Sequence, residues 1–349
     1  MKTQTVERQR GTVTLLVPPR IVSSSCVVGK MEGDGPLSAY FDHVEPDVTC
    51  GQPSWELAES RMQKLAFDYA LEQAKMQPDE LDFIYAGDLL SQCTASTYGL
   101  RAESVPFFGV YGACSTMAET LALGAMAVGG GFASRVACVT GSHFCSAERQ
   151  FRMPLEYGGQ RAPTAQWTVT GAGCVVLGNG MHTSCGARNG QYAQHITHFT
   201  VGKIVDAGVT DANNMGAAMA PAAHDTITRH LRDLGVSPAH YDLILTGDLG
   251  SVGSDILLDL CARDGVDLRG LHNDCGMMIY DPDTQDVHAG GSGCGCSASV
   301  LCGRVLTGMA RGEWKRVLLC ATGALMSPIT AAQGETIPGI CCAVSIANA

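Results

Sequence analysis

The chain alternates between short apolar runs and longer stretches in which apolar residues recur every three or four positions. Short runs are typical of buried strands, and the longer spacing is typical of helices. The short runs predict strands over residues 12–17, 82–89, 107–111 and 135–143, and we expect the third to be buried. The helical spacing predicts helices over about residues 55–75, 92–103 and 115–128, the first with Ser54 as its N-cap. This alternation predicts a mostly parallel α/β sheet with helices on both faces.

The second half of the chain repeats the pattern of the first. The matching pairs are residues 242–249 with 82–89, residues 295–298 with 113–116, and residues 316–323 with 135–141. Three matches in the same order predict an internal duplication, with halves at residues 1–190 and 191–349. The duplication would place Cys114 and Cys296 on helices related by a pseudo-two-fold axis. Ligand sites favour junctions of this kind.

Cys114 follows a predicted strand and precedes a predicted helix, in the segment Tyr-Gly-Ala-Cys-Ser-Thr at residues 111–116. The free N–H groups and the positive dipole end of that helix would then point at the thiol. Such a setting favours the thiolate, so Cys114 could act as a nucleophile or lie beside a bound anion. The alternative is a buried cysteine that serves as a small apolar side chain.

Between the two halves the pattern is less regular. Residues 144–165 are richer in charge and proline, so we predict an irregular excursion that could act as a lid. Residues 166–177 predict a strand pair or a bend, residues 179–191 a Gly- and Asn-rich loop, and residues 195–201 another strand.

Composition narrows the functional classes. The 46% of hydrophobic and 16% of charged residues are typical of a soluble globular protein. The net charge of −11 argues against a nucleic-acid surface and against anchoring to anionic lipid. We expect no secretion signal and no membrane span, and therefore an intracellular location with the sixteen cysteines reduced. The absence of a Cys-x-x-Cys pair disfavours a metal site, and we expect no resident cofactor.

The two halves, with a Cys at the N-terminus of a buried central helix, resemble the thiolase-like fold, whose layers run α-β-α-β-α. More narrowly, the sequence resembles the stage V sporulation protein AD family of spore-forming bacteria. The segments that carry this resemblance are residues 28–37, 86–90, 111–116, 147–152, 163–173, 215–223, 273–280 and 285–293.

The resemblance implies a function and partners. It implies binding of dipicolinic acid, free or as its Ca²⁺ chelate, in support of its uptake into the developing spore. It also implies membrane-spanning partner proteins at the spore inner membrane. Thiolase-like proteins commonly dimerise through the strand near the nucleophile, so the resemblance makes a homodimer an expectation as well.

Thiolase-like enzymes need a His and a further His or Asn beside the nucleophile, to stabilise an oxyanion and move a proton. The resemblance places these groups at Gly247 or Asp248 and within residues 292–294, and neither slot holds His or Asn. A carboxylate beside Cys114 would disfavour the thiolate. We therefore predict a non-catalytic protein in which Cys114 is a vestigial nucleophile. The alternative is an acyltransferase that uses Cys114 as nucleophile and His143 as its base.

A pocket for a small planar dianion needs hydrogen-bond donors for the carboxylates and an apolar slot for the ring. Helix N-termini and nearby cations could supply the donors. Arg149 and Lys203 are further candidate cations, with exposed surface charges as the alternative. Asp88 and Asp248, at equivalent strand ends, would fit helix caps or a Ca²⁺ site better than a bare anion pocket. The predicted ligand-binding residues are Asp88, Cys114, Ser115, His143, Arg152, Asp274, Ser292 and Cys296.

Overall fold

The computed structural model describes residues 6–9, 11–152, 161–179 and 192–349. The elements of the first half are β1 (Val6–Gln9), β2 (Thr12–Leu15), β3 (Arg20–Gly29), α1 (Lys30–Gly33), η1 (Ser38–Tyr40), β4 (His43–Glu45), α2 (Trp55–Ala74), η2 (Pro78–Glu80), β5 (Phe83–Gly87), η3 (Ser91–Cys93), α3 (Thr94–Leu100), β6 (Phe107–Gly109), η4 (Ala113–Ser115), α4 (Thr116–Gly129), β7 (Arg135–Ser142), α5 (Phe144–Phe151), β8 (Trp167–Thr168) and β9 (Gly171–Gly178).

The elements of the second half are β10 (Gln194–Thr200), α6 (Met215–Leu234), η6 (Pro238–His240), β11 (Leu243–Thr246), α7 (Gly250–Arg263), β12 (His272–Asp274), α8 (Cys275–Ile279), β13 (Gly291–Ser292), α9 (Cys294–Val300), the π-helical turn η7 (Leu301–Val305), α10 (Leu306–Ala310), β14 (Arg316–Ala324), α11 (Pro328–Ala332) and β15 (Gly339–Asn348).

The sheet order confirms the predicted duplication. The strands follow the order β12-β11-β14-β15-β10-β3-β9-β7-β5-β6, so each half contains the same five-strand arrangement, read in opposite directions. In each half one strand, β9 or β15, runs antiparallel to both neighbours, and the other four run in one direction. The halves meet where His195 of β10 pairs with Arg20 of β3. The predicted boundary between residues 190 and 191 lies outside the described residues.

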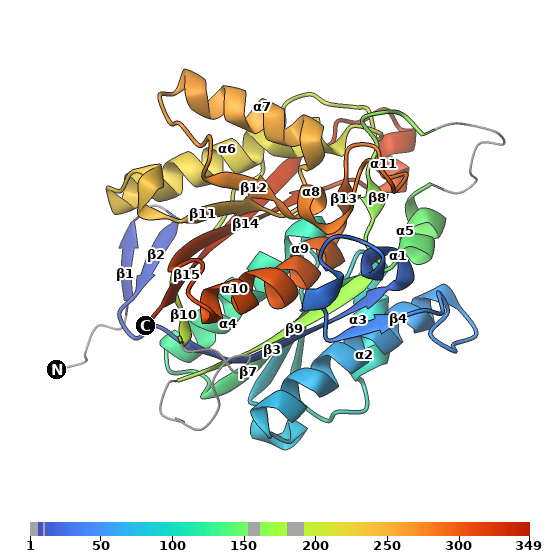
Figure 1. The fold of residues 1–349 in the computed structure, drawn as a ribbon, viewed down its shortest axis with the longest axis vertical. Helices are drawn as coiled ribbons and strands as arrows, with labels where there is room; N and C mark the ends of the chain where they lie inside the picture. The colour runs from blue at the N-terminus through green and yellow to red at the C-terminus, as the bar shows by residue number, and fades with distance from the viewer. Residues whose placement is uncertain (1–5, 10, 153–160, 180–191) are drawn as a thin grey trace.

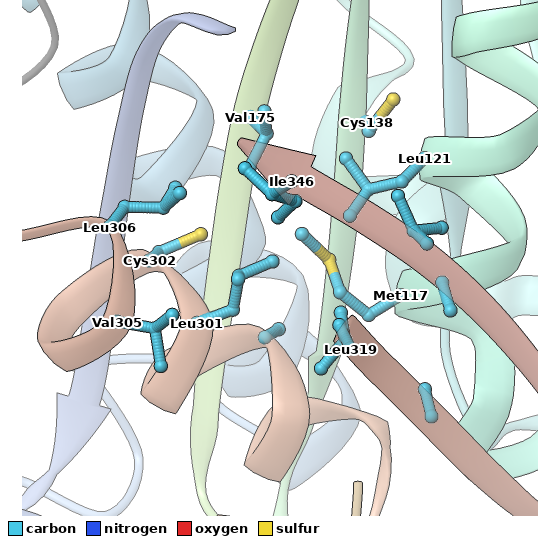
Figure 2. Close-up of a cluster of buried hydrophobic side chains, with 14 of the residues drawn as sticks. Met117, Leu121, Cys138, Val175, Leu301, Cys302, Val305, Leu306, Leu319 and Ile346 are labelled. Atoms are coloured by element: carbon cyan, nitrogen blue, oxygen red, sulfur yellow. The ribbon is translucent and has the colours of Figure 1, made fainter. Parts of the chain in front are cut away.

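The layers follow the thiolase-like pattern (Figure 1). Helices α2 and α3 cover the outer face of the first half, and α6 packs on the outer face of the second half with α7 beside it. Helices α4, α9 and α10 lie between the two halves of the sheet. Figure 2 shows the core at this junction, where Met117 and Leu121 of α4 approach Leu301, Val175 and Ile346. The buried central helices position both repeats of the Cys turn.

One aspartate in each half ties the start of one strand to its neighbour. The carboxylate of Asp82 accepts hydrogen bonds from the N–H groups of Ser134 and Arg135, at 2.6 and 3.0 Å. Asp242 accepts in the same way from Lys315 and Arg316, at 2.6 and 2.8 Å. The repeat in the sequence is therefore a repeat of contacts as well.

The first long helix, α2, agrees with its prediction, whereas strand β3, which packs against it, was not predicted. Helix α2 begins after Ser54, whose hydroxyl accepts a hydrogen bond from the N–H of Leu57 at 3.4 Å. Strand β3 was not predicted, because serines interrupt its apolar pattern. These serines are buried, and Ser23 and Ser25 donate to carbonyl groups of α2. Buried hydroxyl groups with partners of this kind are compatible with a core strand.

Two predictions in the first half were wrong. The run at residues 107–111 is not buried, because β6 is an edge strand, and Phe108 and Tyr111 are 52% and 55% exposed. The predicted irregular excursion begins instead with the helix α5, capped by His143, and residues 153–160 lie outside the described residues.

Within the described ranges, no helix combines the length and apolarity that crossing a membrane requires.

Candidate functional site

A cavity of about 260 Å³ opens at Cys114. Its walls come from η4, α5, the end of β13 and the segment between β14 and α11, so both halves contribute. Apolar side chains, among them Leu89, Phe151 and Met326, form much of the lining. The polar side chains in the wall are Tyr111, Cys114, Glu148, Arg152, Thr168, Ser292 and Ser327. A small apolar slot with a few convergent polar groups is typical of a ligand site.

The Cys114 turn depends on a tight backbone. Ala113 adopts a left-handed conformation with φ of 52°, and a Cβ added to Gly112 would lie 2.2 Å from the Glu119 carboxylate. The Ser115 hydroxyl shares its one proton between the Gly112 carbonyl, at 2.7 Å, and the Glu119 carboxylate, at 2.6 Å. Ser115 therefore holds the turn, and its side chain does not line the cavity as predicted.

Asp248 is the carboxylate beside Cys114. It accepts hydrogen bonds from the N–H of Gly293 and the hydroxyl of Thr322, both at 2.9 Å, and from Ser292 at 3.4 Å. Burial raises the pKa of Asp248 to about 6. Burial also raises the pKa of the Cys114 thiol well above its usual range, and the charge of Asp248 raises it further. Cys114 is therefore a thiol rather than a thiolate, despite the helix that follows it.

Arg152 is the cation of the cavity wall, and it is paired. Its Nη1 lies 2.8 Å from Oε1 of Glu148, which also lines the cavity. Burial raises the pKa of Glu148, and the nearby Arg152 lowers it. The other candidate cations lie in surface ion pairs, Arg149 with Glu56 and Lys203 with Asp225. Cys114, Arg152 and Ser292 are thus the three predicted residues that the structure brings together at this cavity.

Two predicted aspartates serve the backbone and do not line the cavity. Asp88 accepts from the N–H of Leu90 at 2.8 Å and from the N–H and hydroxyl of Ser96 at 2.8 and 2.6 Å. Asp274 accepts from three N–H groups and a hydroxyl, which belong to Leu249, Gly250, Gly276 and Thr246. Each is fully buried and ties an element end to its neighbours, a role close to the cap that was the alternative for Asp88.

The structure gives His143 a structural role and does not place it on the cavity wall. Its Nε2 lies 2.8 Å from the carbonyl oxygen of Val48, which can only accept, so Nε2 carries the proton. Its Nδ1 accepts the N–H of Cys145 at 3.1 Å. Burial lowers the pKa of His143. Both ring nitrogens are engaged, so this geometry contradicts the alternative in which His143 is the base for Cys114.

Cys296, the repeat of Cys114, does not reach the cavity either. It is completely buried within α9, and burial raises the pKa of its thiol well above the usual range. Glu148, Tyr111, Thr168 and Ser327 were not predicted. The spacing of Glu148 and Arg152, four residues apart on a helix, was the one sequence signal for their pairing.

No group of three or more His, Cys, Asp or Glu side chains within the described ranges could hold a metal ion. The fifteen cysteines that the structure describes are all free thiols. The chemistry of the site therefore rests on hydroxyl groups, one ion pair and a neutral thiol beside a carboxylate.

The sequence and the fold each have known counterparts. The family model described as Stage V sporulation protein AD (SpoVAD) matches residues 9–347. Stage V sporulation protein AD of Bacillus subtilis (strain 168) is 46% identical over 323 residues, which cover 93% of this chain and 92% of that protein.

Solved structures show the likeness of fold. With 3-oxoacyl-(acyl-carrier-protein) synthase III from Aquifex aeolicus VF5 the TM-score is 0.56 at 16% identity, covering 94% of this chain and 99% of the other. With human mitochondrial 3-ketoacyl-CoA thiolase it is 0.57 at 12% identity, covering 96% and 99%. The fold is thus thiolase-like, and by its sequence the chain belongs to the Stage V sporulation protein AD family.

Proposed function

We propose that the cavity at Cys114 binds dipicolinic acid, free or as its Ca²⁺ chelate, and that the protein is a non-catalytic component of its uptake into the developing spore. The observation that carries the proposal is the neutral Cys114 thiol, held beside Asp248 in a cavity with no described histidine in its wall. An acyl-transfer site needs an activated thiol and a group that moves its proton. A binding site needs neither.

The cavity suits a small flat acid. Leu89, Phe151 and Met326 offer apolar surface for a ring, and the guanidinium of Arg152 can pair with a carboxylate. The hydroxyl groups of Ser292 and Ser327 can donate to the second carboxylate. Glu148 lies in the wall and Asp248 lies beside Cys114, and the raised pKa of each carboxyl reduces the repulsion that it would exert on an anion.

Calorimetric titration with dipicolinate tests the proposal, with Arg152→Gln as the variant. Loss of a charge-assisted hydrogen bond costs about 1.5–3 kcal/mol, so we expect affinity to fall by about tenfold or more. Arg149→Gln is the matched control, because Arg149 lies on the same helix but pairs with Glu56 at the surface. Full affinity in Arg152→Gln would place the ligand elsewhere, and no binding to the unmodified protein would end the proposal.

The competing function is that of an acyltransferase with Cys114 as its nucleophile. The thiolase-like fold and the position of Cys114 in the cavity favour this function. Incubation with acyl-CoA donors, followed by mass spectrometry of the Cys114 peptide, separates the two functions. We expect no acylated Cys114 and no turnover. Accumulation of an acyl-enzyme would establish the competing function.

We also propose that the protein acts at the spore inner membrane through membrane-spanning partners. The support is family membership, together with the lack of a membrane-spanning helix within the described ranges. Fractionation of sporulating cells tests this, because the protein should leave the membrane fraction when those partners are deleted.

We also propose a homodimer that forms through strand β6. The exposed Phe107 and Phe108 on this edge strand support it.

A further inference from the structure

A second and larger cavity, of about 490 Å³, lies apart from the Cys114 cavity and shares no lining residue with it. It is formed by the end of β3, by α1, by the segment after β4 and by the start of α5. The proposed function does not use it. Its wall combines carboxylates with apolar and aromatic side chains.

Glu32 lies in the wall of this cavity and is 1% exposed. Its Oε1 accepts hydrogen bonds from the N–H of Thr170, at 2.9 Å, and from the hydroxyl of Tyr280. Its Oε2 is buried and has no hydrogen-bond partner among the described residues. A Cβ added to Gly29 would lie 2.9 Å from Oε2, so this buried oxygen lies directly against Gly29, itself a lining residue. A buried polar atom without a partner is costly, so it points to a missing donor.

Most of the charged side chains in the wall are acidic. Asp34, Glu45 and Asp47 line the cavity with Glu32, and Lys30 is the single basic residue of the lining, paired with Asp34. Burial raises the pKa of Glu32 to about 7, against the hydrogen bond from Tyr280, which lowers it. A cation in the cavity would favour the ionised carboxylate, whereas an anion would meet repulsion.

The apolar part of the wall selects the kind of cation. Met31, Met62 and Val48 line the cavity, and so do Phe144 and Trp167, whose rings stack at 3.8 Å between centroids. Methionine and aromatic side chains are suited to methylene and ammonium groups. A bare metal ion fits poorly, because no described cluster of three or more His, Cys, Asp or Glu side chains could hold one.

We propose that this second cavity binds a small organic cation, an aliphatic amine whose ammonium group pairs with the carboxylate of Glu32 and whose methylene groups lie along the methionine and tryptophan side chains. The remaining carboxylates, Glu45 and Asp47, attract a second ammonium group, so diamines and polyamines fit better than monoamines. The inference is independent of dipicolinate binding, because the two cavities are lined by different residues.

Calorimetry with spermidine and with cadaverine tests the proposal on the full-length protein, at about pH 8, where these amines stay protonated. Glu32→Gln keeps an oxygen for Thr170 and Tyr280 but removes the charge. We expect it to weaken spermidine binding by about tenfold or more. Asp79→Asn is the matched control, since Asp79 is exposed and lies in neither cavity, and it should bind spermidine as the unmodified protein does.

Val48→Lys is a second variant, which places a competing ammonium group at the cavity from a half-exposed position. It should also weaken spermidine binding, and it does not alter the buried Glu32. Unchanged spermidine affinity in a folded Glu32→Gln protein would overturn the proposal. So would saturable binding of CaCl₂ in place of the amines, or the absence of any saturable amine binding at moderate salt.

Discussion

The role of Asp248 can be tested by replacing it with asparagine. Asparagine has the same shape, and its carbonyl can still accept the N–H of Gly293. Its amide can donate to the Thr322 hydroxyl, because a hydroxyl both donates and accepts. The substitution therefore removes the charge beside Cys114 while keeping the local hydrogen bonds. Any change in the reactivity of the thiol then reports the charge.

The size of the effect follows from the contact. A hydrogen bond to a charged group is worth about 1.5–3 kcal/mol, and about 1.4 kcal/mol is a factor of ten in the ratio of thiolate to thiol. We expect Asp248→Asn to raise the alkylation rate of Cys114 about tenfold at a fixed pH. Burial, the larger cause of the raised pKa of Cys114, is unchanged, so the thiol remains the main form at neutral pH.

The assay is alkylation by iodoacetamide at increasing pH, followed by mass spectrometry of the Cys114 peptide. Because the pKa of Cys114 is raised, its rate should still be climbing where an ordinary cysteine, with a pKa of about 8.5, has levelled off. Cys145 is the control within each sample, since it is less deeply buried and does not line the Cys114 cavity.

Two outcomes would refute this reasoning. If Cys114 of the unmodified protein reacts faster than Cys145 at about pH 8, the thiolate is the native form, and the argument against catalysis fails. If the Asn variant and the unmodified protein react alike, Asp248 does not control the thiol.

Two further predictions concern the repeat and the edge strand. Asp82→Ala and Asp242→Ala should each lower the free energy of unfolding by about 1–3 kcal/mol, since each removes a carboxylate that accepts two N–H groups. Urea denaturation measures both free energies of unfolding. If the two losses of stability differ by more than about 2 kcal/mol, the two aspartates do not stabilise their halves equally. Phe108→Glu should convert a dimer to a monomer in analytical ultracentrifugation, because it places charge on the exposed edge strand. A dimer that survives this change would place the interface elsewhere.

The fold could be predicted largely because the sequence repeats itself. The matching runs around Asp82 and Asp242 occur where the two halves make the same backbone contacts. The repeat in the sequence therefore corresponds to a repeat in the structure. The missed strand β3 shows the limit of hydrophobic patterning. Its serines look exposed in the sequence, and carbonyl groups of α2 make Ser23 and Ser25 acceptable in the core. Those partners are more than forty residues away along the chain.

The candidate site was predictable only in part, for a related reason. The strand–turn–helix pattern located Cys114, but the direction of a neighbouring side chain depends on distant partners. His143 donates from Nε2 to a carbonyl 95 residues earlier, and this contact leaves Nδ1 to cap α5 by accepting the N–H of Cys145. Ser115 turns toward Glu119 on the following helix. In each case the residue type and its position in the local element were read correctly, and the hydrogen-bond partner was not visible in the pattern.

The two aspartates of the repeated Gly-Asp-Leu run, Asp88 and Asp248, show how a duplicated element acquires two roles. In the first half, Asp88 accepts the N–H of Leu90 and the donors of Ser96. In the second half, the helix α7 begins at Gly250, directly after this run, whereas α3 of the first half begins only at Thr94. The N–H of Gly250, which corresponds to that of Leu90, is bound by Asp274.

Strand register explains why Asp274 can take over this contact. Ala86 of β5 pairs with Gly109 of β6, and at the equivalent place Thr246 of β11 pairs with Asp274 of β12. Gly109 has no side chain, so Asp88 must satisfy the backbone of its own turn. The carboxylate supplied by Asp274 releases Asp248 from that task, and Asp248 turns to Gly293 and the Cys114 thiol. The difference between a cap and a site residue therefore depends on one side chain of a neighbouring strand.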